Sequence, residues 1–197
     1  MPQLSVEKIN PHTTLLVWKI TETEEQLKSQ LPESVLETIT NKNYKSESRR
    51  LEVMATYALL ASYLKTPSVI IDHKSNGQPL LDGFYISISH TNGYACVLLS
   101  TQKVVAIDIE YRSDRIERIR SKFLRSDEAF TSIEDLLLVW SAKETLYKYF
   151  SEDDLMYNEM KVESISDSSL SMINLETNEK KMVSYLSTPN YVLTYLV

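Results

Sequence analysis

The stretch Val104-Val105-Ala106-Ile107-Asp108-Ile109-Glu110 opens the second half of this 197-residue chain. A short run rich in β-branched residues predicts a strand, and side chains alternate along a strand, so Asp108 and Glu110 are expected on the same face. Two carboxylates on one face repel each other unless a proton or a cation lies between them. The pattern therefore predicts either a solvated strand end or an acidic site with oxygen ligands suited to Mg²⁺.

Downstream of this strand, residues 132–150 read SIEDLLLVWSAKETLYKYF and predict a long helix. Its apolar residues are expected to supply much of the core of this half; they are Leu136, Leu137, Trp140, Leu146, Tyr147 and Phe150. Glu144 and Lys148 are one helical turn apart and share one side of the helix. This spacing fits an ordinary surface ion pair, and it also fits a carboxylate and an ammonium directed into a cleft.

The remaining patterns predict a mixed fold with two comparable halves. In the first half we expect strands at residues 13–20, 69–72, 84–90 and 94–100, and helices at residues 24–39, with a break at Pro32, and 46–64. In the second half we expect a helix at residues 114–123 and strands at residues 161–165, 170–175, 182–186 and 191–196. The expected class is α+β, with a two-layer α/β arrangement in halves covering residues 1–103 and 104–197.

Composition excludes several classes of protein. A net charge of −6 and a pI of about 5.2 argue against a general nucleic-acid binder, which is usually basic. The single cysteine, Cys96, allows no disulfide within the chain and fits a reducing compartment. Residues 1–10 contain no apolar signal-peptide core, and no run approaches the ~18 apolar residues of a membrane span. We therefore expect a cytoplasmic protein with neither nucleic acid nor membrane as a partner.

Polar residues in the first half form a further candidate site. Asn76-Gly77-Gln78-Pro79 predicts a turn, and Ser87-Ile88-Ser89-His90-Thr91 follows it at a strand end. A lone histidine is more often structural than catalytic. A row of hydroxyls beside a histidine is, however, also able to accept and donate hydrogen bonds around phosphate oxygens.

Taken in order, four motifs resemble the 4′-phosphopantetheinyl transferases of the surfactin-synthetase-activating type. They are the Asn-Gly-Gln-Pro turn, Ile88-Ser89-His90, Ile107-Asp108-Ile109-Glu110, and the helix motif that runs from Trp140 through Lys143-Glu144 to Lys148. The resemblance covers residues 46–150, about half of the chain. It departs from the family at Ala106, where glycine is usual, at Gln78, where a basic residue is common, and in the acidic, glycine-free residues 151–157.

The resemblance implies a pseudo-dimer of two similar halves with coenzyme A in the cleft between them. It implies that Asp108, Glu110 and Glu144 bind Mg²⁺ facing the pyrophosphate, and that Lys148 contacts the phosphate oxygens. Glu144 is the first candidate for the base that activates the carrier serine, and Lys143 is the second. The 3′-phosphate is expected to bind His90, Ser89, Thr91 and Arg50 or its neighbour Arg49. The adenine pocket is expected to be lined by Gly77, Gln78 and Pro79.

A local basic segment suggests how an acidic partner binds. Its members are Arg112, Arg115, Arg118, Arg120, Lys122 and Arg125. Carrier proteins are commonly acidic, so the resemblance implies that this segment attracts an apo acyl or peptidyl carrier protein. Ile116, Ile119 and Phe123 would then either contact the carrier or form the core face of an ordinary amphipathic helix. Two halves in one chain predict a monomer.

Three other functions fit the same residues. The first is a non-catalytic relative that binds coenzyme A or a carrier, although the presence of all three acids and both lysines weighs against it. The second is another Mg²⁺-dependent phosphate-transfer enzyme that acts on a different nucleotide. The third is an interaction domain with no dependence on Mg²⁺.

Overall fold

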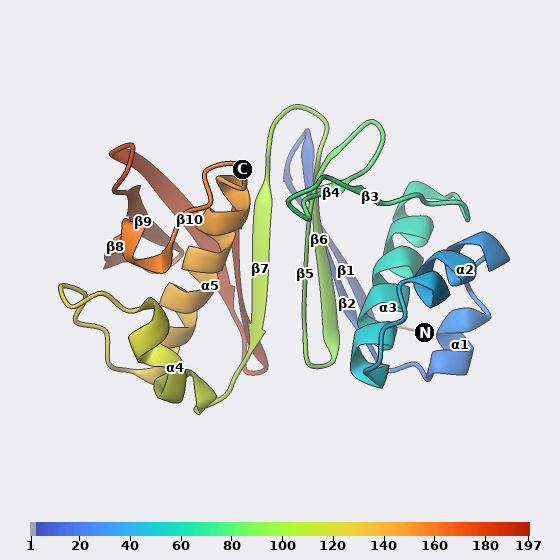
Figure 1. Cartoon of the computed structure of the whole chain (residues 1–197), viewed down its shortest axis with the longest axis horizontal. Coiled ribbons are helices and arrows are strands. Elements are labelled where there is room, and N and C mark those ends of the chain that lie inside the picture. The colour runs from blue at the N-terminus through green and yellow to red at the C-terminus, as the bar shows by residue number, and fades with distance from the viewer. Residues whose placement is uncertain (1–2) are drawn as a thin grey trace. The chain divides into compact units, whose positions relative to one another are not determined.

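The computed structural model describes residues 3–197, which form two compact units that meet in the sequence between Gln102 and Lys103. The first two residues of the expected 1–103 half lie outside the described residues. Each unit combines one antiparallel sheet of four or five strands with α-helices (Figure 1). The mixed α+β class predicted from the sequence is therefore confirmed.

The sheet of the first unit has the order β1-β2-β6-β5 and is antiparallel throughout. Its strands are β1 (Gln3–Asn10), β2 (Thr13–Lys19), β5 (Tyr85–Thr91) and β6 (Tyr94–Ser100). The central strands β2 and β6 are almost wholly buried, which explains their apolar sequences. Strand β1 was not predicted, because it is an edge strand whose Val6 remains 48% exposed and whose sequence carries no clear apolar face.

Three helices complete the first unit: α1 (Glu24–Lys28), α2 (Glu33–Asn41) and α3 (Glu47–Leu64). The Thr23 hydroxyl caps α1, Pro32 immediately precedes α2, and the Ser46 hydroxyl accepts a hydrogen bond from Arg49 N at the start of α3. Helix α3 packs on β6, β2 and β5, and α1 and α2 pack on α3 (Figure 1). The start of α3 and the end of β5 belong to the same core and border the cavity described below.

The predicted strand at residues 69–72 is largely wrong. Val69 and Ile71 are buried in the core, but the backbone pairs only in β3 (Asp72–His73), which meets β4 (Pro79–Leu80). Proline has no amide N–H to donate to a ladder, so the pairing is limited to two residues. Between β3 and β4, Gly77 has a φ of +85°, a conformation that favours glycine, and it turns the chain.

The second unit is a five-stranded antiparallel sheet with the order β7-β11-β10-β9-β8. Its strands are β7 (Ala106–Tyr111), β8 (Met160–Ile165), β9 (Ser169–Asn174), β10 (Glu179–Ser187) and β11 (Tyr191–Leu196). Its helices are α4 (Arg115–Phe123), α5 (Ile133–Tyr149) and the short 3-10 helix η1 (Tyr157–Glu159). Helix α5 packs mainly on β7 and β11 (Figure 1), so it faces the strand that carries Asp108 and Glu110.

The core of the second unit lies between α5, α4 and the sheet. Leu136, Leu137 and Leu146 are buried there as expected, but Tyr147 is 40% exposed and is not a core residue. Ile116 and Phe123 of α4 are buried in this core, so the apolar face of α4 is an internal packing face. In the described part of the chain, none of the helices combines the length and the apolar character needed to cross a bilayer.

Candidate functional site

Three carboxylates and one ammonium come together between β7 and α5. Lys148 Nζ donates to Asp108 Oδ1 over 2.8 Å, and it also donates to the backbone oxygen of Ile107 over 2.9 Å. Trp140 Nε1 donates to Glu110 Oε1 over 2.7 Å. The alternation in β7 and the helical turn from Glu144 to Lys148 thus place charged groups of two elements beside one another.

The ionisation of Glu110 and Glu144 is perturbed by burial and by like charge. Burial, together with the negative charge of Asp108, raises the pKa of Glu110 to about 7, although the Trp140 hydrogen bond opposes the shift. Burial also raises the pKa of Glu144, with a further contribution from Asp108. Lys148 lowers both pKa values, so it offsets part of the repulsion. The cluster favours an added proton or a bound cation.

The donor set of this cluster fits Mg²⁺ in its chemistry. Among residues 3–197, no three His, Cys, Asp or Glu side chains are arranged to hold a metal ion together. Mg²⁺ usually takes only one or two protein carboxylates and completes its shell with water and phosphate oxygens. A cation would relieve the mutual repulsion of Asp108, Glu110 and Glu144, so these three carboxylates are the candidate ligands.

A row of three buried hydroxyl groups, linked by short contacts, ends at the carboxylate of Asp108. Ser141 Oγ donates to Asp108 Oδ2 over 3.0 Å and lies 2.9 Å from Thr194 Oγ1, which lies 2.6 Å from Thr145 Oγ1. All four side chains are buried, and Thr194 stands opposite Asp108 in the β7–β11 ladder. This row of hydroxyl groups therefore fixes the orientation of the Asp108 carboxylate from the interior of the unit.

Lys143 does not join the carboxylate cluster, which corrects its assignment as an alternative base. Its ammonium is fully buried, pairs with Glu128 Oε2 at 2.8 Å and donates to Phe123 O at 2.7 Å. Burial lowers the pKa of Lys143, and the charge of Glu128 opposes that shift. Both groups are enclosed and engaged with each other, so Lys143 has a structural role in holding α5, the end of α4 and the 125–128 turn together.

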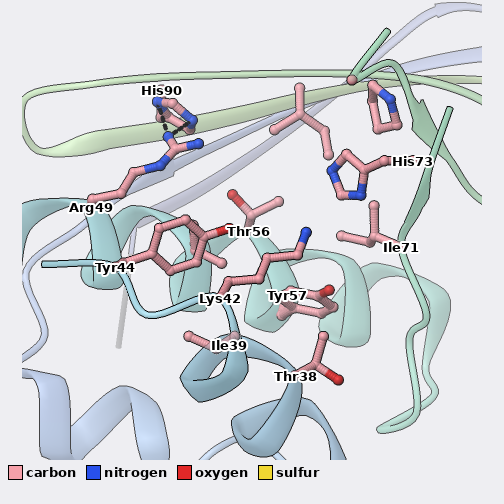
Figure 2. Close-up of a pocket in the computed structure, with 14 residues that line it drawn as sticks. Thr38, Ile39, Lys42, Tyr44, Arg49, Thr56, Tyr57, Ile71, His73 and His90 are labelled. Carbon is pink, nitrogen blue, oxygen red and sulfur yellow. Dashed lines mark hydrogen bonds between the residues drawn. The ribbon is translucent and has the colours of Figure 1, made fainter. Parts of the chain in front are cut away.

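A cavity of about 180 Å³ lies within the first unit, beside the start of α3. Figure 2 shows Lys42, Arg49, His73 and His90 arranged around it, with the ring of Tyr44 below Arg49. Its remaining lining includes Thr38, Ile39, Val53, Thr56, Tyr57, Ile71, Gly77, Pro79 and Ile88. A mixture of basic groups, aromatic rings and apolar walls suits a ligand that is both anionic and partly flat.

The residues expected to bind a 3′-phosphate do not all face this cavity. Arg49 Nη1 lies 3.0 Å from His90 Nδ1, and both residues line the cavity (Figure 2). Arg50 instead pairs with Glu24 through Nε and Nη2, at 3.1 and 2.9 Å. Ser89 and Thr91 are buried on the face of β5 opposite to His90, because adjacent strand residues point in opposite directions. Of the expected group of His90, Ser89, Thr91 and Arg50 or its neighbour Arg49, only Arg49 and His90 line this cavity.

Two of the three residues expected around an adenine line this cavity. Gly77 and Pro79 line the cavity, whereas Gln78 is not among its lining residues. Lys42, Tyr44 and His73 were missed from the sequence, although all three line the cavity. Burial lowers the pKa of His73, and nearby Lys42 contributes to that shift. These residues come from the α2–α3 connection and from β3, and no sequence spacing links them to His90.

Helix α4 presents a basic surface on the side away from its buried face. Arg115, Arg118, Arg120 and Lys122 are exposed, and within residues 3–197 none of the four has an ion pair with a described carboxylate. Arg112 and Arg125 differ, because Arg112 pairs with Glu134 and Arg125 pairs with Asp127. The basic segment seen in the sequence therefore has two parts. Four exposed basic residues lie on α4, and Arg112 and Arg125 are held in ion pairs.

Comparison with known proteins identifies a relationship for the second unit. No curated protein matches the chain. A family model, however, matches a stretch that covers the carboxylate cluster, α4 and α5. Residues 104–196 match the family model of the 4′-phosphopantetheinyl transferase superfamily.

Proposed function

We propose that this protein transfers the 4′-phosphopantetheine arm of coenzyme A to a serine of an apo acyl or peptidyl carrier protein. The reaction depends on Mg²⁺, releases 3′,5′-ADP and is of the surfactin-synthetase-activating type. The observation that carries the proposal is the cluster of Asp108, Glu110, Glu144 and Lys148 inside the matched residues 104–196. A cytoplasmic monomer is part of the proposal, and the single cysteine, Cys96, which allows no disulfide within the chain, fits that location.

The proposed chemistry is an attack of the serine oxygen on the phosphorus that carries the pantetheine arm. The bond from that phosphorus to the bridging oxygen breaks, and 3′,5′-ADP leaves. Glu144, whose pKa is raised by burial, accepts the serine proton. Lys148 donates to phosphate oxygens as negative charge develops on the leaving group. Asp108, Glu110 and Glu144 would hold Mg²⁺, which supplies neutralisation of the pyrophosphate charge when bound.

The cavity of the first unit is proposed to bind the nucleotide end of coenzyme A. Arg49, His90 and Lys42 supply cationic or hydrogen-bonding groups for the 3′-phosphate. Tyr44 and Tyr57 supply aromatic surface, and the turn at Gly77 and Pro79 closes the cavity on another side. Arg49 lies within 4 Å of both Glu52 and His90, so it is already oriented at the edge of the cavity.

The exposed basic face of α4 is proposed to attract the carrier. Arg115, Arg118 and Lys122 lie three and four residues apart and therefore share one side of the helix. Ile116 and Phe123 are engaged in the core, so the attraction is mainly electrostatic. Such contacts chiefly raise the rate of association and fall in strength with added salt.

Intact-mass spectrometry of an apo carrier protein after incubation with this protein, coenzyme A and Mg²⁺ tests the proposal. We expect a gain of ~340 Da, the mass of one phosphopantetheine arm, which is absent without Mg²⁺ and in Asp108→Asn and Glu144→Gln. Glu176→Gln, an exposed carboxylate of the same unit, is the matched control and should retain the gain. Coenzyme A binding without any gain, across unrelated carriers, would favour a non-catalytic relative. Release of product from a different nucleotide would favour another phosphate-transfer enzyme.

A further inference from the structure

Tyr157 is fixed from three sides beside the carboxylate cluster. Its hydroxyl donates to Glu144 Oε1. Its ring lies against Trp140, with centroids 5.2 Å apart and planes tilted by 36°. Its backbone oxygen accepts a hydrogen bond from Lys143 Nζ at 3.3 Å. A side chain held at its ring, its backbone and its polar end has little freedom to change position.

The backbone of Tyr157 is anchored by a buried ion pair. Lys143 and Glu128 are both fully enclosed, and Glu128 Oε1 also accepts from Val162 N over 2.7 Å. A buried pair of this kind is costly to disturb, because removal of one partner leaves an uncompensated charge. The pair therefore ties η1, β8 and α5 together at the point where Tyr157 begins η1.

Two successive residues of α5, Lys143 and Glu144, thus form hydrogen bonds with the backbone and with the hydroxyl of Tyr157. Lys143 binds its backbone oxygen, and Glu144 accepts from its hydroxyl. Trp140 joins the same arrangement, since it stacks on Tyr157 and donates to Glu110 Oε1. Phe123 also contacts Trp140, edge-on and at a centroid distance of 5.2 Å. Packing alone needs only the ring of Tyr157, so the hydroxyl is the informative group.

We propose that Tyr157 is a positioning residue for Glu144. Its hydroxyl holds Oε1 and fixes the side-chain conformation, which leaves the other carboxylate oxygen directed for the cation or for the serine proton. The inference rests on the proposed function for its catalytic consequence, although the contact itself does not. Neutral donors that orient a ligating carboxylate commonly change metal affinity or activity by about 10- to 100-fold when they are removed.

The test is Tyr157→Phe in the full-length protein, with Mn²⁺ as the probe. This change keeps the ring against Trp140 and removes only the hydroxyl. Binding of Mn²⁺ to the free protein, followed by electron paramagnetic resonance, should weaken by about tenfold. Transfer to the carrier should lose about as much in kcat while KM for coenzyme A stays within about twofold. Tyr149→Phe is the matched control, because the Tyr149 hydroxyl meets Lys181 at 3.3 Å, and both readouts should stay unchanged.

A double variant shows whether the effect passes through Glu144. In a Glu144→Gln background, Tyr157→Phe should cause no further loss of Mn²⁺ affinity, since the oriented carboxylate is already gone. A further loss of about tenfold would overturn the proposal, as would wild-type Mn²⁺ affinity in Tyr157→Phe or no Mn²⁺ binding by the wild-type protein. If the wild type modifies no carrier but Tyr157→Phe still weakens Mn²⁺ binding, the proposed reaction fails and the positioning role stands.

Discussion

Ser141 donates its hydroxyl hydrogen to Asp108 Oδ2 over 3.0 Å, while Lys148 donates to the other carboxylate oxygen over 2.8 Å. The two donors come from the same helix, α5, at positions seven residues apart, which is close to two helical turns. One oxygen of Asp108 is thus held from the buried side and the other from the partly exposed side. The orientation of this carboxylate is set by packing between α5 and β7 before any ligand binds.

Ser141→Ala should destabilise the protein by about 1–3 kcal/mol, because it removes a donor from a buried carboxylate and interrupts the row of hydroxyl groups that runs through Thr194. The free energy of unfolding in urea measures this loss. Ser121→Ala, at an exposed position of α4, should change it by less than about 0.5 kcal/mol. Equal values for the two variants would mean that the row of hydroxyl groups does not hold Asp108.

Much of this arrangement was predictable from periodicity. The alternation in residues 106–110 placed Asp108 and Glu110 on one face, and the spacing of Glu144 and Lys148 placed them on one side of a helix. The structure adds the hydrogen-bond partner of each of these charged side chains. Lys143 and Lys148 belong to the same motif, yet five residues turn the helix by about 140°, so one ammonium enters the core and the other reaches Asp108.

Tertiary partners explain what the sequence could not supply. Tyr157 lies in the short 3-10 helix η1 and Glu128 in the turn after α4, where neither a period of 2 nor one of 3.6 applies. Ser89 and Thr91 are a different case, since strand alternation alone already places them on the face of β5 opposite to His90. The choice between Arg49 and Arg50 depended on Glu24 in α1, which attracts Arg50 away from the cavity.

Stability should fall as pH rises in the absence of metal because of Glu110. Its pKa is raised from 4.5 to about 7, so the folded protein binds this proton more tightly than the unfolded chain does. The resulting stabilisation is complete below about pH 4.5 and is lost as pH rises through about 7. It amounts to on the order of 3 kcal/mol. Urea unfolding with a chelator present, from pH 5 to 8, measures it.

Glu110→Gln should remove this pH-dependent contribution and be the more stable protein at pH 8. Glu176→Gln, at an exposed site, should retain the wild-type slope. In the wild-type protein, added Mg²⁺ should restore the stability that is lost at pH 8, because a bound cation stabilises the ionised carboxylate of Glu110. Because the pKa of Glu144 is also raised, a smaller slope should remain in Glu110→Gln, and a slope equal to that of the wild type would assign the pH dependence to other groups.

Neighbouring arginines should differ sharply in their effect on coenzyme A binding. Arg49→Gln removes a cation from the cavity wall and should weaken coenzyme A binding by about tenfold or more, as measured by calorimetry. Arg50→Gln should leave that affinity within about twofold, because Arg50 pairs with Glu24 outside the cavity lining. The loss for Arg49→Gln should shrink when the ligand lacks its 3′-phosphate. Equal losses for the two variants would place the nucleotide elsewhere.

Reversal of one charge on the exposed face of α4 should weaken carrier recognition selectively. Arg118→Glu should raise KM for an acidic carrier several-fold at low salt, because it replaces attraction by repulsion at a site without a described ion pair. The difference from wild type should decline as the ionic strength rises, since exposed charges are screened. KM for coenzyme A should not change. Lys19→Glu introduces the same charge at an exposed position of β2, so it separates a local effect from one of net charge. If Lys19→Glu raised KM for the carrier as much as Arg118→Glu does, the attraction would belong to the whole protein and not to α4.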